Sequence, residues 1–260
     1  MKLAGTIALV TGASGGIGQA TARALARHGV HLVLTGRDAG VLETLATEVG
    51  GRAVPADLTG RKAIAKMMKQ AGPVDILVAN AGVIAPARMT DHDLDEIDHY
   101  LELNLRVPLV MARLAAERMV ANGRGHLVFM SSIGGKMAHP HLAVYNATKH
   151  GLRGFGHAAR MDLAPYGVGV SVICPGLVRD AGMLTRTSLT VPPWMTRSPL
   201  HVARAVCRAI LTDAAEIDVA PLPVRVAAGL ASVWPGAGAR VQRLMGVEGY
   251  ARAAAGRGFL

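Results

Sequence analysis

The sequence has few cysteines, few aromatic residues and no long apolar run. Its two cysteines, Cys174 and Cys207, are too few and too far apart for a disulfide framework or a metal-ligand cluster, so we expect a reducing, cytoplasmic compartment. Aromatic residues make up 3% of the chain, which provides almost no stacking platform for single-stranded nucleic acid. The nearest candidate for a membrane span, residues 226–239, is short and broken by proline and glycine.

Acidic residues are scarcer than basic ones. The chain has 28 Lys and Arg against 18 Asp and Glu, a net charge of +10. This charge permits attraction to nucleic acid, anionic lipid or phosphorylated ligands, but the basic residues are scattered and form no run of five or more. We therefore expect no nucleic-acid partner. With 51% hydrophobic and 18% charged residues, the 260-residue chain should fold and bury a core.

Short apolar runs alternate with longer amphipathic stretches through most of the chain. We predict strands at residues 7–10, 31–34, 53–55, 76–79, 126–130, 169–173 and 217–219. Helices are predicted between them, at residues 16–27, 39–49, 61–70, 101–121, 143–163 and 199–211. This alternation is typical of an α/β protein whose helices cover both faces of a parallel sheet, a Rossmann-like doubly wound fold. Ligands of such folds bind at the carboxyl ends of the strands.

The alternation stops at about residue 221, after which Pro, Gly, Ala and Arg dominate. We therefore divide the chain into a Rossmann-like domain at residues 1–220 and a C-terminal appendage at residues 221–260. Short amphipathic helices are predicted at residues 224–233 and 239–245. Packing of these helices on the body or on a neighbouring subunit is favoured over contact with a membrane surface, which stays the alternative.

A glycine-rich turn follows the first predicted strand and leads into a helix. Residues 11–18 read TGASGGIG, with the spacing T-G-x-x-x-G-x-G. Glycines here allow a tight turn and let the backbone approach a pyrophosphate, whose charge faces the helix amides and the positive end of the helix dipole. We therefore predict a dinucleotide site whose contacts come from Gly12, Ser14, Gly15, Gly16, Ile17 and Gly18.

The position that distinguishes the two nicotinamide cofactors lacks the usual acid. A NAD site places a carboxylate at the end of the second strand, where it binds the ribose 2′-hydroxyl. Gly36 stands there, and Arg37 follows it. Because a guanidinium pairs well with a 2′-phosphate, NADP(H) is favoured over a role for Arg37 as a simple turn cap. NAD(H) stays an alternative, since Asp38 could turn toward the ribose if Arg37 points away.

Residues suited to carbonyl chemistry follow the fifth predicted strand. The strand ends in Ser131 and Ser132, Tyr145 lies thirteen residues beyond Ser132, and Lys149 lies four beyond Tyr145. A spacing of four puts Tyr145 and Lys149 on one helix face. A nearby ammonium favours phenolate, so we expect Lys149 to lower the pKa of Tyr145 and Tyr145 to act as a general acid/base. A serine hydroxyl at the strand end could hydrogen-bond the substrate oxygen.

Over roughly residues 3–220 the chain resembles the short-chain dehydrogenase/reductase family. The matching motifs are TGASGGIG at 11–18, Asp57-Leu58, ANAG at 79–82, Asn104, Ser132, YNATK at 145–149 and Pro175-Gly176. The resemblance implies a seven-stranded sheet in the order 3-2-1-4-5-6-7 and hydride transfer between a nicotinamide and a carbonyl or secondary alcohol. It also implies a catalytic tetrad of Asn104, Ser132, Tyr145 and Lys149. Asn104 would hold a water, Lys149 would also bind the nicotinamide ribose, and the spacing to Tyr145 favours Ser132 over Ser131.

The same resemblance implies further cofactor contacts. Asp57 would accept a hydrogen bond from the adenine amino group, and Leu58 would flank the ring. The other residues that it assigns to the cofactor are Asn80, Ala81, Gly82, Pro175, Gly176 and Val178, besides Tyr145 and Lys149. The chain departs from the family at Ala79, which replaces an asparagine, and at Asp180, which replaces a threonine that bonds the nicotinamide carboxamide. Gly15 stands where some NADP-preferring members carry a basic residue.

The sequence predicts the chemical class of the substrate. Residues 177–198 would form a lid, and we expect a moderately apolar small-molecule carbonyl or alcohol beneath it. The apolar wall of this lid would come from Met183, Leu184, Val191, Trp194 and Met195. We expect His139 and His141 in a solvated loop, and we expect no metal site.

Two further expectations concern the oligomeric state of the protein and whether it catalyses a reaction. By resemblance, the long helices that carry Asn104 and Tyr145 pair across a subunit interface, so a homodimer or homotetramer is expected. The alternative to an enzyme is a regulatory or scaffold protein that binds the dinucleotide without turnover. Such a protein would have no need for Ser132, Tyr145 and Lys149 together.

Overall fold

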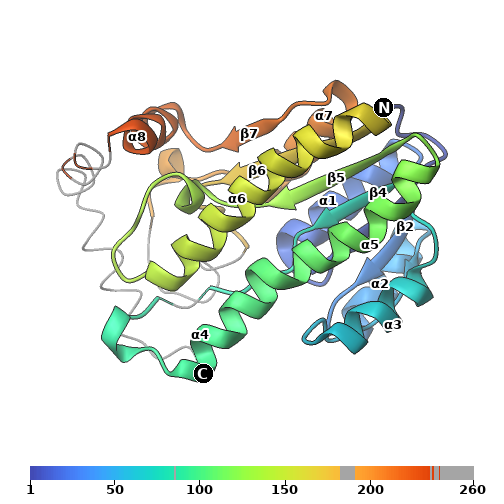
Figure 1. Ribbon diagram of the computed structural model, residues 1–260, viewed down its shortest axis with the longest axis horizontal. Helices are drawn as coiled ribbons and strands as arrows, with labels where there is room; N and C mark the ends of the chain where they lie inside the picture. The colour runs from blue at the N-terminus through green and yellow to red at the C-terminus, as the bar shows by residue number, and fades with distance from the viewer. Residues whose placement is uncertain (85, 182–190, 235, 237–239, 241–260) are drawn as a thin grey trace.

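Seven parallel strands form the centre of the molecule in the computed structural model (Figure 1). The structure describes all residues except 85, 182–190, 235, 237–239 and 241–260. The spatial order of the strands is β3-β2-β1-β4-β5-β6-β7, which confirms the predicted Rossmann-like fold. The strands are β1 (Ile7–Thr11), β2 (His31–Thr35), β3 (Arg52–Ala53), β4 (Ile76–Ala79), β5 (Gly125–Met130), β6 (Val168–Pro175) and β7 (Glu216–Val219).

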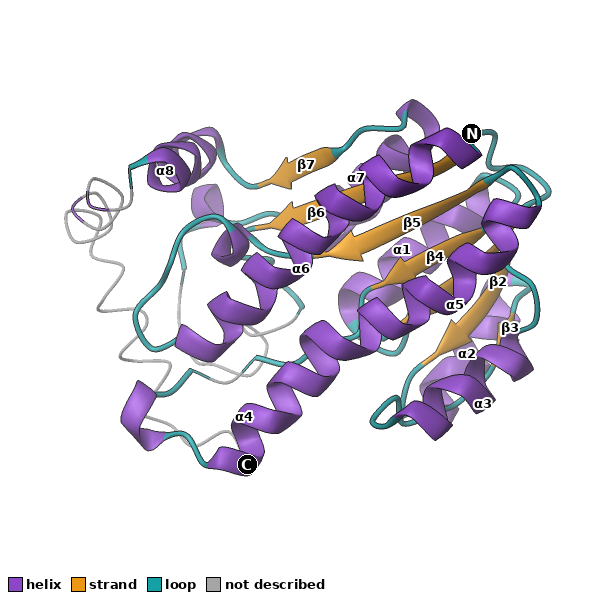
Figure 2. Cartoon of the chain, in the orientation of Figure 1, coloured by secondary structure: helices purple, strands orange, loops and turns teal. Residues whose placement is uncertain are grey.

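Helices cover both faces of this sheet (Figure 2). Buried side chains such as Leu25 and Val206 pack one group of helices, α1, α2 and α7, against one face. Met111 and Leu152 belong to the apolar cluster that packs α3, α5 and α6 against the other face. The helices are α1 (Gly16–Arg27), α2 (Ala39–Val49), α3 (Arg61–Ala71), α4 (Leu94–Leu101), α5 (Val107–Ala121), α6 (Ala143–Leu163), α7 (Pro199–Thr212) and α8 (Leu222–Val233).

The helix predicted at residues 101–121 begins earlier and is interrupted. α4 starts after the N-cap Asp93, whose side chain and that of Glu96 form a capping box. A π-helical turn, η2 (Glu102–Arg106), then joins α4 to α5. The predicted start at residue 101 was seven residues late, although Leu94, Ile97 and Leu101 recur at helical spacing in α4.

α6 lies close against the sheet, and a glycine allows this approach. A Cβ on Gly156 would lie 2.5 Å from Cγ2 of Val172 in β6 and 3.3 Å from the ring of Phe129 in β5. Any larger residue would push the helix outward. The N-terminal turns of α6 therefore lie beside the carboxyl ends of β5 and β6, where a doubly wound fold binds its ligands.

The appendage begins as an ordered helix. The predicted helix at residues 224–233 is α8, whereas the one at 239–245 lies almost wholly outside the described residues. α8 packs on a small apolar cluster that contains Ile133, Val172 and Ala220, at the end of the sheet toward which the strands point (Figure 1). Among the described residues, no helix is long and apolar enough to cross a membrane.

Candidate active site

The turn after β1 is a close-fitting backbone loop. Gly12 has a φ of 62°, and a Cβ there would lie 2.9 Å from Cα of Ala81. A Cβ on Gly18 would lie 2.2 Å from the Gly12 carbonyl oxygen, so a side chain at position 18 would displace backbone. Gly16 faces the segment after β6, where a Cβ would lie 2.9 Å from Cβ of Ala181. These contacts give the glycines the close packing that the sequence predicted.

The amino end of α1 is open to an anion. Its N-cap is Gly15, no side chain caps the helix, and its first turn contains no acidic residue. The first amides of α1 therefore present their hydrogens and the positive end of the helix dipole to the loop. Ile17 is partly buried and packs against the apolar cluster on this face of the sheet. A pyrophosphate suits this arrangement.

Thr11 ties this loop to the end of β4. Its hydroxyl oxygen accepts hydrogen bonds from the amides of Asn80 and Ala81, both at 2.9 Å. In return, Nδ2 of Asn80 donates to the Thr11 carbonyl oxygen at 2.9 Å. Ala79 is buried among apolar side chains at the end of β4, so the residue that departs from the family pattern fits its surroundings. Two predicted cofactor residues, Asn80 and Ala81, thus lie against the glycine-rich turn.

The end of β2 explains the missing carboxylate. Gly36 is buried, and a Cβ there would lie 2.9 Å from Oγ of Ser14, so the two side chains would compete for one space. Asp38 is engaged elsewhere, because its carboxylate accepts a hydrogen bond from the Val41 amide at 3.0 Å and caps α2. Turning Asp38 toward a ribose would break this cap, at a cost of about 1 kcal/mol.

Arg37 and Asp57 lie on the same side of the site. Arg37 is exposed, and among the described residues it makes no ion pair or hydrogen bond. The pKa of Asp57 is lowered, first by the hydrogen bond from the Thr59 amide and in smaller part by the charge of Arg37. Leu58 is buried in the cluster beneath α3, so its side chain packs in the core. Contact of Asp57 and Leu58 with adenine stays a prediction.

The two serines after β5 differ in their surroundings. Ser131 is buried, and its hydroxyl donates to the Lys149 carbonyl oxygen at 2.9 Å. Ser132 is partly exposed, accepts a hydrogen bond from the Gly134 amide at 3.0 Å and donates to the Pro175 carbonyl oxygen at 3.3 Å. Ser131 therefore fastens α6 to β5, which leaves Ser132 as the hydroxyl that faces the crevice.

Tyr145 and Lys149 lie together in the first two turns of α6. Lys149 is buried, with Nζ 5.6 Å from the centre of the Tyr145 ring and 2.9 Å from the Met130 carbonyl oxygen to which it donates. Burial lowers the pKa of Lys149 to about 8. Burial also raises the pKa of Tyr145, and a hydrogen bond with Ser132 opposes that rise only in part. The expectation that Lys149 lowers the pKa of Tyr145 is wrong for this structure, because desolvation outweighs any effect of the ammonium.

Asn104 lies in the π-helical turn and is 1% exposed. Its Oδ1 accepts a hydrogen bond from the Val83 amide, and its Nδ2 donates to the Val83 carbonyl oxygen, both at 2.8 Å. A Cβ on Gly82 would lie 2.9 Å from this Oδ1 and 3.6 Å from Nζ of Lys149. Asn104 thus holds the segment after β4 beside Lys149. Its contact with a water stays a prediction.

The segment after β6 completes the crevice. The Gly176 amide donates to the Val219 carbonyl oxygen at 3.1 Å, and Val178, which is buried, forms an isolated parallel bridge with Arg197. Asp180 has a φ of 60°, and its side chain is exposed. Its backbone carbonyl oxygen, rather than its carboxylate, approaches the glycine-rich turn, 3.3 Å from the position of a Cβ on Gly16. A carboxylate here could accept a hydrogen bond from a carboxamide nitrogen in place of the family's threonine, and that contact stays a prediction.

Part of the predicted lid is described. Met183 and Leu184 lie outside the described residues. Val191 and Met195 are partly buried, whereas Trp194 is exposed. Their role as an apolar wall stays a prediction.

The two loop histidines sit between Ser132 and Tyr145 as expected. The His139 carbonyl oxygen accepts a hydrogen bond from Nδ2 of Asn146 at 3.2 Å. His141 has a φ of 61°, and its carbonyl oxygen accepts from the Ala87 amide at 2.9 Å. Their backbone carbonyls therefore help to shape the loop beside the crevice.

Sequence reasoning missed a largely buried ionic network behind this site. Nζ of Lys136 lies 2.6 Å from Oε1 of Glu216 and 2.6 Å from Oδ1 of Asp218. Nε of Arg153 lies 2.5 Å from Oε2 of Glu216, and Nε2 of His157 lies 3.0 Å from the same oxygen. Lys136 follows Ser132 by four residues, and Arg153 and His157 lie one and two turns beyond Lys149 in α6. The charges were visible in the sequence, but their partners are 59 to 82 residues away.

This network also contains the described residues closest to a metal-ligand set. Ligand atoms of Cys174, Glu216 and Asp218 lie within 4.8 Å of one another. The ammonium of Lys136 contacts both carboxylates. Burial raises the pKa of Cys174 to about 12, so its sulfur is a protonated thiol. The cluster therefore already has its counter-charge and does not suit a metal ion.

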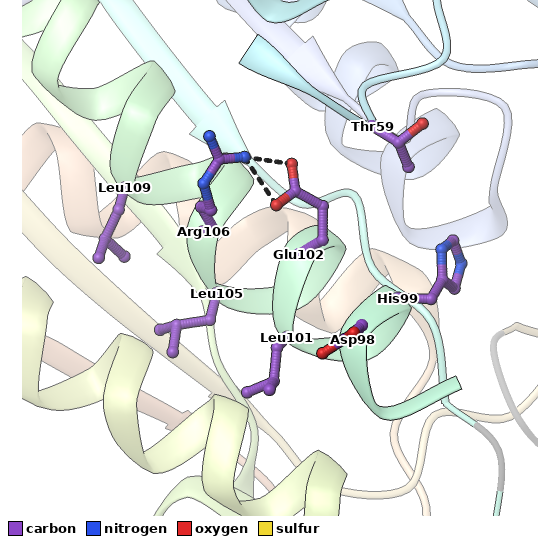
Figure 3. Close-up of a pocket in the computed structure, with 8 residues that line it drawn as sticks. All are labelled: Thr59, Asp98, His99, Leu101, Glu102, Leu105, Arg106 and Leu109. Atoms are coloured by element: carbon purple, nitrogen blue, oxygen red, sulfur yellow. Dashed lines mark hydrogen bonds and ion pairs between the residues drawn. The ribbon is translucent and has the colours of Figure 1, made fainter. Parts of the chain in front are cut away.

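A separate cavity of about 600 Å³ lies beside α4 and α5 (Figure 3). It is lined by Thr59, Asp98, His99, Leu101, Glu102, Leu105, Arg106 and Leu109. Figure 3 shows Arg106 paired with Glu102 at its edge, and the same carboxylate accepts a hydrogen bond from the Gly60 amide at 3.0 Å. None of the predicted catalytic side chains lines this cavity.

Comparison with known proteins agrees with this site. A family model described as short chain dehydrogenase matches residues 6–191. Ketoacyl reductase HetN of Nostoc sp. is 34% identical over 232 residues, which are 85% of this chain and 81% of that protein. The solved structure of a short chain dehydrogenase/reductase family protein has a TM-score of 0.79 at 32% identity, covering 84% of this chain and 97% of the other. A 3-ketoacyl-(acyl-carrier-protein) reductase from Brucella melitensis complexed with NADH gives 0.77 at 27% identity, covering 84% and 98%.

The family match spans most of the chain, from β1 through the segment after β6. It therefore includes the glycine-rich turn, Asn104, Ser132, Tyr145 and Lys149. The sheet order and the solved structures agree with it. The protein belongs to the short-chain dehydrogenase/reductase family of oxidoreductases.

Proposed function

We propose that this protein is a NAD(P)(H)-dependent oxidoreductase that interconverts a carbonyl and a secondary alcohol on a moderately apolar substrate. The observation that carries the proposal is the meeting of Ser132, Tyr145 and Lys149 at the carboxyl end of β5. The Ser132 hydroxyl interacts with Tyr145, and buried Lys149 lies next to the tyrosine ring. A hydroxyl pair backed by an ammonium provides the groups needed to polarise a carbonyl and to transfer a proton.

Tyr145 acts as the general acid in the direction of reduction. Burial raises its pKa, which keeps the hydroxyl protonated until it donates to the carbonyl oxygen. Ser132 donates a hydrogen bond to the same oxygen. Lys149, whose pKa is about 8, can hold or release a proton near neutral pH and resupplies Tyr145. Asn104 keeps the Gly82 segment in place beside Lys149 and completes the proton path through a water.

The residues present fit a dinucleotide. A pyrophosphate would meet the uncapped amides of α1, and Gly12, Gly16 and Gly18 allow the tight packing of the loop that presents these amides. Bound nicotinamide would supply or accept the hydride at the substrate carbon. Gly82, Pro175, Gly176 and Val178 would line its site, as would the residues that Thr11 holds, Asn80 and Ala81.

NADP(H) is the preferred cofactor in this proposal. The exposed guanidinium of Arg37 lies where a 2′-phosphate would need a cation, and Asp38 is held by its helix cap. NAD(H) is the alternative, and the Brucella melitensis reductase is described as complexed with NADH. Asp57 would contact adenine in either case, whereas the buried side chain of Leu58 leaves only its backbone for such a contact.

The proposed substrate is a ketone on an apolar chain. Two of the compared proteins are described as ketoacyl reductases, and Val191, Trp194 and Met195 would supply apolar contacts for such a chain. We further propose a cytoplasmic homodimer or homotetramer, in which α5 and α6 pair between subunits. Residues 1–220 form its catalytic domain, and residues 221–260 are the appendage.

The test is the Tyr145→Phe substitution, which removes the hydroxyl that donates the proton. We expect kcat for NADPH-dependent reduction of a 3-ketoacyl thioester to fall by roughly 10² to 10⁴, while the Kd for NADPH changes little. The matched control is Tyr166→Phe, because Tyr166 is exposed at the end of α6 and should not affect kcat.

Two results would contradict the proposal. Equal rates for Tyr145→Phe and the wild-type protein would show that Tyr145 is not the acid/base. Tight NADPH binding without turnover of any ketone or alcohol in a broad panel would favour the silent dinucleotide-binding protein.

A further inference from the structure

The outer face of α8 is apolar and exposed. Four of its side chains are 51–86% exposed, namely Leu222, Val226, Leu230 and Val233. At the helical rotation of about 100° per residue, they lie within an arc of about 80°. Trp234, which follows the last helical residue, is 72% exposed. Together these five side chains form what we call the α8 outer face.

The inner face of α8 is already packed. Ala228 and Ala231 are buried in the cluster that contains Ile133 and Met137, and Ala227 is also buried. Ser232 adds a hydrogen bond from Oγ to the Lys136 carbonyl oxygen at 3.2 Å. The helix therefore docks on the body through its alanines and directs its larger apolar side chains away from it. A helix that is apolar on both faces is normally covered on both.

The charge around α8 indicates what covers its outer face. From residue 220 to the C-terminus the sequence contains one acidic residue, Glu248, and five basic ones, Arg225, Arg240, Arg243, Arg252 and Arg257. Arg225 is exposed and lies next to the apolar arc on α8. An apolar arc beside an exposed arginine, with a tryptophan at the helix end and a basic sequence after it, suits the interface of an anionic bilayer. A second copy of this chain would add the same positive charge, which opposes pairing.

We propose that α8 is an interfacial membrane contact that docks the protein on anionic lipid. The apolar side chains of the α8 outer face would enter the boundary between headgroups and acyl chains, and Arg225 would remain at the level of the lipid phosphates. Packing on the body was favoured from the sequence over membrane contact. The structure makes the two compatible, because packing uses the alanine face and leaves the larger side chains outside.

The position of α8 relates this contact to the crevice. α8 packs on η3 (Ile133–Gly135), the turn that directly follows Ser132, and lies at the end of the sheet toward which β5, β6 and β7 point (Figure 1). A bilayer that contacts α8 would therefore lie next to the entrance of the site. An apolar substrate dissolved in that bilayer could reach the crevice over a short distance. The membrane contact itself does not depend on the proposed activity.

The experiment is sedimentation of the full chain with lipid vesicles. One set contains phosphatidylcholine and phosphatidylglycerol in equal amounts, and the other contains phosphatidylcholine alone. We expect binding to the anionic set, with an affinity about tenfold or more higher than for the neutral set. Leu230→Glu should lower the affinity for anionic vesicles by about tenfold or more, because it places a carboxylate in the apolar arc.

The matched control is Leu211→Glu. Leu211 is 47% exposed in the last turn of α7, so its substitution makes the same change of residue and charge at another exposed leucine. It should leave nearly all vesicle binding in place. Thermal unfolding of both variants should match the wild-type protein, because neither side chain is buried.

Three outcomes would overturn the proposal. Absence of wild-type binding to anionic vesicles would remove the membrane contact. Equal loss of binding in Leu230→Glu and Leu211→Glu would mean that net charge alone causes adsorption. A smaller particle mass for Leu230→Glu by light scattering, with vesicle binding unchanged, would show that the α8 outer face joins copies of this chain instead.

Discussion

At the scale of single residues, we predict that cofactor choice depends on Arg37. We expect Arg37→Ala to raise the Kd for NADPH about tenfold or more, a loss of at least ~1.4 kcal/mol, and to leave the Kd for NADH nearly unchanged. The physical reason is that Arg37 is exposed and uncommitted among the described residues, whereas Asp38 caps α2. Fluorescence titration of both cofactors at one fixed ionic strength measures the two constants.

The control for this measurement is Arg113→Ala. Arg113 is exposed on α5, where it pairs with Glu117, and its removal tests the general effect of losing one positive charge. Equal weakening of NADPH in both variants would assign the effect to net charge. Binding of NADH as tight as that of NADPH in the wild-type protein would make Asp38 the ribose ligand and refute the assignment of Arg37.

Lys149 leads to a prediction about stability and pH. Burial lowers its pKa in the folded protein to about 8 from an ordinary value of 10.5, so between these values the unfolded chain binds more protons. The free energy of unfolding should therefore rise with pH across this window, by roughly 2–3 kcal/mol from this residue between pH 8 and 10. Lys149→Met, which keeps the stem and removes the charge, should abolish the rise. Urea unfolding at several pH values measures it.

An exposed lysine provides the comparison for Lys149. Lys66 lies on the exposed side of α3, and Lys66→Met should retain the wild-type pH dependence. The cysteines also titrate at high pH. The difference between the two variants in the pH dependence of unfolding therefore gives the contribution of Lys149 alone. If the stability of Lys149→Met rises with pH as much as that of the wild-type protein, Lys149 does not have the pKa shift that its burial implies.

At the scale of elements, Glu216 holds three of them together behind the site. Glu216 lies in β7 and pairs with Lys136, which follows η3. It also pairs with Arg153 and His157, which lie on α6. Burial alone would raise the pKa of Glu216, but hydrogen bonds from Arg153 and Lys136 lower it to about 2. The network therefore braces both the turn after Ser132 and the helix that carries Tyr145.

Glu216→Gln keeps the shape of this side chain and removes its charge. We expect a loss of about 3 kcal/mol in the free energy of unfolding at pH 7, because Arg153 loses its carboxylate partner and Lys136 keeps only Asp218. Since the folded pKa is below the ordinary value of 4.5, this stabilisation is complete above pH 4.5 and disappears as pH falls toward 2. The wild-type protein and the variant should therefore converge in stability across that window, as measured by urea unfolding.

The exposed pair of Arg113 and Glu117 supplies the control for Glu216. Glu117→Gln should change stability by less than about 1 kcal/mol, because exposed ion pairs are well screened. If Glu216→Gln costs no more than Glu117→Gln, the network does not brace these elements.

The helices and strands themselves follow closely from local patterns. α1, α2 and α6 have the predicted ends, and β4 has the predicted bounds. The clearest error is α4, which the sequence prediction omitted although Leu94, Ile97 and Leu101 recur there at helical spacing. Its capping pair, Asp93 and Glu96, was the signal that could have placed it.

At the scale of the whole molecule, the sheet order brings the site together. The glycine-rich turn follows β1, Asn80 follows β4, and Ser132 follows β5, and these three strands are neighbours in the sheet. Because all strands are parallel, their carboxyl ends share one edge. α8 then adds an exposed apolar face at the same end of the molecule.

The sequence by itself determined the fold class, the family resemblance and the identity of the polar residues at the strand ends. These features are encoded locally, by helical and strand periodicity, by glycine spacing and by the four-residue step from Tyr145 to Lys149. Only the tertiary structure decided the burial that raises the pKa of Tyr145, the closure of the Lys136 and Glu216 pair, and which face of α8 stays outside. Desolvation and ion pairing depend on what packs around a side chain, and those neighbours come from distant parts of the chain.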